Sequence, residues 1–157
     1  MATDNNNETV SVLNGLIETC RDGEKGFTTA AEGSKSADLK QFFSEMASQR
    51  STFAHELEVK VTGLGGKPAD MGHVAAVAHR GWMNIKTAVS GNDDKAILNE
   101  CERGEDFAKK AFSDALSEAL PADLRPMIAR QSGDVTTAHD KVRDLRDRQN
   151  AMSDAAH

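Results

Sequence analysis

The pentapeptide Cys20-Arg-Asp-Gly-Glu24 returns 81 residues later as Cys101-Glu-Arg-Gly-Glu105. Both copies have the pattern Cys-x-x-Gly-Glu, and both lie in a stretch where apolar residues recur every three or four positions. That spacing places the apolar side chains on one face of a helix. The sequence therefore predicts two related amphipathic helices, each with a glutamate at one step of its apolar face.

The same periodicity predicts an all-α chain of five helices. The Gly/Pro-rich stretch from Gly63 to Pro68 separates the second helix from the third, because glycine and proline interrupt helices. Proline is tolerated in the first turn of the last helix. The expected ranges are Glu8–Glu32, Ala37–Val61, Gly72–Val89, Asp94–Leu120 and a helix that starts between Pro121 and Pro126 and ends near Asn150.

A second internal similarity relates the second helix to the fifth at an offset of 82 residues, where Gln49 meets Gln131. Two related hairpins would then each place one glutamate and one glutamine in the middle of a bundle. A pseudo-twofold arrangement needs a crossover, since a helix of 27 residues spans about 40 Å at 1.5 Å per residue. The alternatives are a simple up-down array of five helices and a chance alignment of heptads.

The composition argues against a nucleic-acid-binding, a membrane-spanning and a disulfide-rich protein. The 157 residues carry a net charge of −6, and no basic stretch suits nucleic acid. We expect no signal peptide from the polar and acidic opening residues, and no apolar run approaches the roughly 20 residues that span a bilayer. The two cysteines are too few for a disulfide scaffold. We expect one cytoplasmic domain over residues 1–157, with frayed tails at 1–7 and 150–157.

Several stretches, taken in order, resemble the ferritin-like superfamily. More narrowly, the chain is similar to an uncharacterised bacterial four-helix-bundle family, a domain of unknown function. The stretches are Gly63-Leu-Gly-Gly-Lys-Pro68, His79-Arg-Gly-Trp82, Cys101-Glu-Arg-Gly-Glu-Asp106, Arg130-Gln131 and Ala138-His139-Asp140. The resemblance implies a ferritin-like four-helix bundle with a helical crossover.

The resemblance also implies a place for two metal ions, which ferritin-like enzymes hold with single glutamates and Glu-x-x-His pairs. Glu24 and Glu105 match the single glutamates. The other two helices depart from the pattern, with Gln49-Arg-Ser-Thr52 and Gln131-Ser-Gly-Asp134. An amide oxygen is a neutral and weaker ligand than a carboxylate. We therefore expect a degenerate dimetal centre, unsuited to oxygen activation.

Two interpretations of these residues stay open. In one, the glutamates and amides form a polar layer that fixes helix register, and Arg50 pairs with Glu24, Glu105 or Asp134. In the other, a divalent metal binds weakly. The candidate ligands of that second interpretation are Glu24, Glu105, Gln49, Gln131, Asp134 and His139.

Other side chains near the predicted centre also have two interpretations. His139 either turns inward as a ligand or bonds a carboxylate on the helix flank. Cys20 and Cys101 are either small buried apolar residues or sulfur ligands.

The leading hypothesis for function is a non-enzymatic cytoplasmic binding or assembly protein without a cofactor, and the resemblance hints at a stress-associated role. A homodimer is expected on base rates. The rival is a metal-binding oxidoreductase or metal-storage protein that uses Glu24 and Glu105. A third hypothesis is a small-molecule pocket between Met46 and Phe53. Trp82, beside Met83, either contacts a partner or packs onto the bundle.

Overall fold

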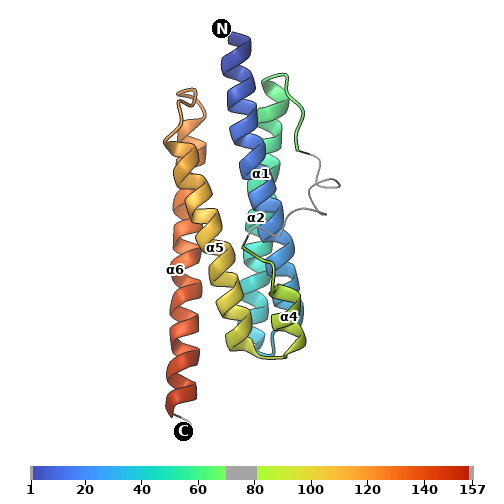
Figure 1. Cartoon of the computed structure of the whole chain (residues 1–157), viewed down its shortest axis with the longest axis vertical. Helices are drawn as coiled ribbons and strands as arrows, with labels where there is room; N and C mark the ends of the chain where they lie inside the picture. The colour runs from blue at the N-terminus through green and yellow to red at the C-terminus, as the bar shows by residue number, and fades with distance from the viewer. Residues whose placement is uncertain (1, 70–80, 156–157) are drawn as a thin grey trace.

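The computed structural model describes residues 2–69 and 81–155, with side chains for 6–69 and 81–152 (Figure 1). Within these ranges the chain is helical and contains no strand, which confirms the all-α class. The helices are α1 (Ala2–Gly33), α2 (Ala37–Gly63), α4 (Ile85–Ser90), α5 (Asp94–Leu116) and α6 (Arg125–Ala155). None of the helices in the described part is long and apolar enough to cross a membrane.

The turn between α1 and α2 is anchored at both sides. The Ser36 hydroxyl accepts a hydrogen bond from the Leu39 backbone N–H at 3.3 Å and so caps α2. The Asp94 carboxylate, at the start of α5, accepts the backbone N–H groups of Lys35 at 2.8 Å and Ser36 at 3.2 Å. These bonds join the first hairpin to the beginning of the second.

The connection from α2 to α5 is the predicted crossover. Helices α1 and α2 form one antiparallel hairpin, and α5 and α6 form the other (Figure 1). The end of α2 and the start of α5 lie at opposite ends of the bundle, so these two helices run parallel (Figure 1). The up-down array of five helices is therefore excluded.

The predicted helix Gly72–Val89 is corrected in its described part. Residues 81–84 form a turn, and α4 begins only at Ile85. The physical reason is Gly81, whose φ of +79° lies in the left-handed region. A Cβ there would lie 2.8 Å from the Arg103 carbonyl oxygen. The expected helical stretch Gly72–Arg80 lies outside the described residues.

Other predicted boundaries also move. Helix α1 already begins at Ala2 and α6 continues to Ala155, so the described parts of the expected frayed tails, 2–7 and 150–155, are helical. Helix α5 ends at Leu116, four residues before the expected Leu120. The Leu116–Arg125 connection is a set of turns in which Arg125 donates hydrogen bonds to the carbonyls of Leu116 and Glu118 at 2.7 and 3.2 Å. Pro126 lies in the first turn of α6, as predicted.

The core consists of two apolar clusters along the bundle axis, which we name cluster A and cluster B. Cluster A includes Leu13, Ile17, Phe53, Leu57, Phe112, Ile128 and Val135. Cluster B includes Phe27, Leu39, Phe43, Trp82, Ile97, Leu98, Cys101 and Val142. Met46 packs against cluster B while Phe53 belongs to cluster A, so the two side chains proposed to line one pocket lie in different clusters.

Trp82 packs into cluster B. Its indole is only 3% exposed and meets the Phe27 ring edge-on at 4.9 Å between centroids. Gly26 and Gly104 leave room for the indole, because a Cβ at either position would overlap it. The neighbouring Met83 is 79% exposed. Of the two interpretations of Trp82, packing onto the bundle is the correct one.

Candidate functional site

An ion pair occupies the middle of the bundle. Arg50 of α2 donates through Nη1 and Nη2 to the two carboxylate oxygens of Glu105 on α5, at 2.5 and 2.7 Å. The side chains are 1% and 0% exposed. Two parallel N–H to oxygen bonds of this kind are the strongest arrangement for an arginine and a carboxylate. The prediction that Arg50 pairs with one of the nearby carboxylates is confirmed, with Glu105 as its partner.

Neighbouring residues pack against Arg50 and face its charge. The arginine stem lies beside α1 at Gly23, where a Cβ would make an ordinary contact of 3.4 Å with Arg50 Cγ. The Arg50 Cζ lies 5.4 Å from the centroid of the Phe27 ring, within cation–π range. The Gln49 amide oxygen accepts the Arg50 Nε–H at 3.2 Å.

The electrostatics of the centre favour a charged arginine and neutral thiols. Burial by itself lowers the pKa of Arg50, but the attraction and hydrogen bonds of Glu105 outweigh it, so that the pKa is raised. Burial raises the pKa of Cys20 to about 12 and also raises that of Cys101, on which the Glu105 charge acts in the same direction. Both sulfurs stay protonated near neutral pH, and a thiol is a poor metal ligand.

Glu24 does not lie in the middle of the bundle, contrary to the predicted pairing of two central glutamates. Its side chain is half-buried at the surface and accepts from Arg21 Nη1 at 2.8 Å, while Arg21 Nη2 contacts Glu58 of α2 at 2.5 Å. The physical reason is a step of three residues: the buried face of α1 runs from Cys20 through Gly23 to Phe27. Glu24 therefore falls one position outside that face.

The two glutamines occupy unlike environments. Gln49 is half-buried beside Arg50. Gln131 of α6 is fully buried, and its Nε2 donates to Glu56 of α2 at 3.1 Å. The Gln131 Oε1 has no hydrogen-bond partner in the described part of the chain. Arg130 reaches the other oxygen of Glu56 at 2.7 Å, so this carboxylate joins α2 to α6.

The remaining candidate ligands lie apart from the central pair. Asp134 is exposed. His139 is buried between α5 and α6, where its Nε2 is 2.6 Å from Asp106 and its Nδ1 is 3.2 Å from Asp140. The structure thus places Glu24, Glu105, Gln131 and His139 against four different sets of partners. Whether any of the predicted ligands binds a metal stays a prediction.

Three carboxylates of this region were not singled out from the sequence: Glu56, Glu102 and Asp106. The missed signal is the spacing Glu102-x-x-x-Asp106, which puts two carboxylates on one face of α5, one turn apart. Nothing in the sequence pairs that face with His139. That contact depends on how α6 is rotated against α5.

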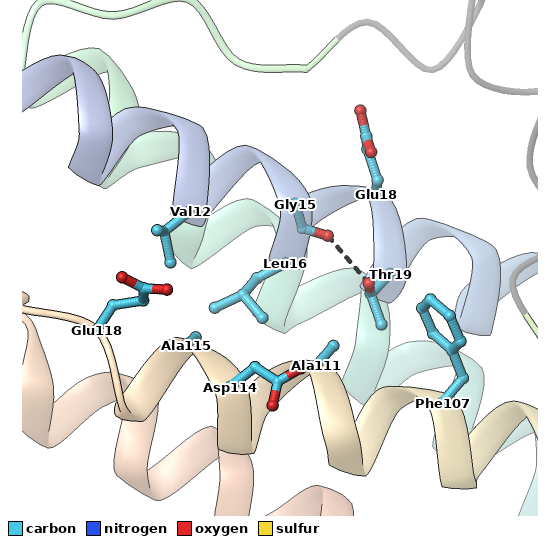
Figure 2. Close-up of a pocket in the computed structure, with 10 residues that line it drawn as sticks. All are labelled: Val12, Gly15, Leu16, Glu18, Thr19, Phe107, Ala111, Asp114, Ala115 and Glu118. Atoms are coloured by element: carbon cyan, nitrogen blue, oxygen red, sulfur yellow. Dashed lines mark hydrogen bonds between the residues drawn. The ribbon is translucent and has the colours of Figure 1, made fainter.

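A groove of about 300 Å³ lies between α1 and α5 on the cluster A side (Figure 2). Leu16 and Ala115 lie toward its floor, Phe107 stands at one end, and Asp114 and Glu118 are on the α5 side (Figure 2). The Thr19 hydroxyl already donates to the Gly15 carbonyl at 2.9 Å, as the dashed line shows (Figure 2). Ligand pockets hold a few converging polar groups, and this groove offers mainly apolar walls.

The sequence profile of a family described as a domain of unknown function, DUF2383, matches residues 8–118. The chain belongs to this family. No curated protein matches the DUF2383 chain in sequence.

Among solved structures, the DUF2383 chain is similar to a point mutant of Mycobacterium smegmatis Dps1, with a TM-score of 0.77. The alignment covers 91% of this chain and 97% of the Dps1 chain at 10% sequence identity. At that identity the similarity concerns the fold alone. The predicted ferritin-like fold, and the resemblance to a domain of unknown function, are both confirmed.

Proposed function

We propose that this protein is a cytoplasmic, non-enzymatic binding or assembly protein built on a ferritin-like bundle. The observation that carries the proposal is the buried pair of Arg50 and Glu105. A dimetal centre needs anionic bridges that offset the charge of its metals. Here the guanidinium holds both oxygens of the central carboxylate, so a cation would have to displace Arg50 in order to bind Glu105.

The rival function, an oxidoreductase or storage protein that uses Glu24 and Glu105, is less well supported. Glu24 is engaged with Arg21 at the surface, and Glu105 is engaged with Arg50 inside. Bringing the two carboxylates to one ion would leave the Arg50 charge buried without a partner, which costs several kcal/mol. The bundle then serves as a scaffold, and its outer surface carries the function.

An iron-oxidation assay tests whether the bundle contains an active dimetal centre. The purified chain is mixed aerobically with Fe(II), and the appearance of Fe(III) is followed beside a buffer control. We expect no acceleration over buffer and no retention of two irons per chain after desalting. The matched variants are Glu105→Gln and the exposed-surface control Asp114→Asn. Fast oxidation with two bound irons, lost in Glu105→Gln but kept in Asp114→Asn, would contradict the proposal.

Molar mass tests the assembly half of the proposal. Light scattering coupled to size exclusion should give a mass above the 16.9 kDa of one chain, with a dimer as the expectation. The measurement is repeated over a hundredfold dilution, since a weak association dissociates on dilution. A monomeric mass at every concentration would mean that the protein does not assemble with itself.

A further inference from the structure

The contact between α5 and α6 brings together three side chains of the kind that bind transition metals. His139 of α6 is 8% exposed, and its Nε2 points at α5. An Asp106 carboxylate oxygen lies 2.6 Å from this Nε2, and Glu102 lies one helical turn earlier on the same face of α5. One ligand atom from each of the three side chains lies within 4.8 Å of the other two.

The second ring nitrogen of His139 is already oriented. Its Nδ1 is 3.2 Å from the Asp140 carboxylate, so Asp140 can accept the Nδ1–H and leave the Nε2 lone pair facing α5. Metal-binding histidines nearly always donate their other N–H to such a group, which fixes the tautomer and the ring orientation.

We propose that Glu102, Asp106 and His139 form a mononuclear site for a divalent cation of the zinc type, with Asp140 as the residue that positions the imidazole. One imidazole and two carboxylates are ligands that such borderline cations accept. Tetrahedral bonds of about 2.0–2.2 Å put two ligands of one ion about 3.4 Å apart. On binding, Nε2 of His139 and the Asp106 oxygen therefore separate from 2.6 Å, and the most distant pair of ligand atoms, now within 4.8 Å, closes by up to about 1.4 Å. Asp106 is exposed, which leaves room for water as a fourth ligand.

Arg146 competes with the cation for the Glu102 carboxylate. Its Nη1 contacts Glu102, and its other guanidinium nitrogens donate to Asp147 at 2.9 and 3.2 Å. When a cation takes Glu102, Arg146 keeps Asp147 as its partner and is not left unpaired. Removing this competitor should therefore strengthen cation binding, which gives the proposal a variant with a gain of affinity.

This site is separate from the central ion pair. Glu102 and Asp106 lie one turn apart on the face of α5 next to α6, whereas Glu105 turns into the core toward Arg50. Cation binding here leaves the pair of Arg50 and Glu105 intact. The inference therefore does not depend on the proposed function, and each can fail without the other.

Zinc titration of the full chain tests the site. The protein is first treated with a chelator, and Zn²⁺ is then added in competition with a chromophoric indicator. We expect one Zn²⁺ per chain, a Kd raised at least about tenfold by Asp106→Asn or Glu102→Gln, and about tenfold by Asp140→Asn. Arg146→Gln should lower the Kd. Asp114→Asn, on the same helix but outside the site, is the matched control and should leave the Kd unchanged.

Cobalt substitution identifies the imidazole. Co²⁺ bound by one histidine and two carboxylates absorbs in the visible range, and this spectrum should be absent in His139→Gln, with helix content checked by circular dichroism. Zinc that is not retained, or that binds with the same Kd in wild type, Asp106→Asn and His139→Gln, would overturn the proposal. In that case His139 would serve only as a hydrogen-bonded link between the two helices.

Discussion

Arg50 and Glu105 depend on each other for their place in the core. Each is a charge withdrawn from water, and each satisfies the other with two hydrogen bonds. Removing one partner from a buried pair is costly, because the remaining charge is left uncompensated. Replacing both partners by apolar side chains removes that problem together with the cost of taking two charges out of water.

We therefore predict opposite outcomes for the single and double substitutions. Arg50→Met should lower the free energy of unfolding by about 3–5 kcal/mol. The double variant Arg50→Met/Glu105→Leu should be as stable as wild type or more stable by about 1–4 kcal/mol. Urea denaturation followed by circular dichroism measures both. A double variant that is clearly less stable than wild type would show that the pair contributes net stability.

The two thiols give a pH dependence. Their pKa values are raised in the folded state, to about 12 for Cys20. In the unfolded chain a thiol titrates near its ordinary value of about 8.5. Their contribution to stability is complete below that value and is lost as pH rises toward the folded pKa.

The free energy of unfolding should consequently decline above about pH 9, by on the order of 2 kcal/mol per thiol near pH 10.5. The variant Cys20→Ala/Cys101→Ala should show a smaller decline over the same range. Below about pH 8 the native protein should not react with a thiol reagent until it is unfolded. Rapid labelling of the native chain would show that burial does not protect the sulfurs.

At the scale of helices, glycine decides how closely α1 and α5 approach Trp82. Gly104→Ala should lower the free energy of unfolding by several kcal/mol, since the new methyl group would overlap the indole and force it out of cluster B. Gly15→Ala is the matched control: the site is also helical and a Cβ there meets nothing within 4 Å. That substitution should raise stability by about 0.5–1 kcal/mol. Equal effects at both positions would contradict the packing of Trp82.

The sequence predicts the helices well because they depend on local residue patterns, and it predicts side-chain contacts less well because these depend on how the helices pack. The spacing of the apolar residues, together with the glycines and prolines that interrupt helices, locates the four long helices. The length of the stretch after Gly63 indicates the crossover. The repeated Cys-x-x-Gly-Glu pattern is misleading in one copy, since α1 buries Gly23 and α5 buries both Gly104 and Glu105. The contact of His139 with Asp106 is out of reach of such reasoning, because a sequence does not give the rotation of α6 against α5.

At the scale of the whole molecule, the two ends of the bundle are packed differently. At the cluster A end, the groove separates α1 from α5 around Leu16 and Ala115 (Figure 2). At the cluster B end, Trp82 lies against both helices, and Asp94 binds the turn after α1. Segments with fewer buried contacts open locally at lower free energy.

We predict that amide hydrogen exchange will be faster at the cluster A end of the bundle than at the cluster B end. Peptides from 111–120 at the end of α5 should exchange faster than peptides from 97–108, although both belong to one helical hairpin. Mass spectrometry of deuterium uptake measures the difference. The helix ends are themselves prone to fray, so the comparison should use amides of 111–115, inside α5. Uniform protection along α5 would contradict the prediction.

The buried ion pair also constrains how this sequence can change over generations. A chain that loses either Arg50 or Glu105 first passes through a form with one unpaired charge in its core, and such forms are strongly destabilised. Natural proteins have only about 5–15 kcal/mol of stability to lose. Loss of the pair therefore requires two nearly simultaneous substitutions, or a stabilising change elsewhere beforehand. Single substitutions at either position are selected against as long as the rest of the bundle is unchanged.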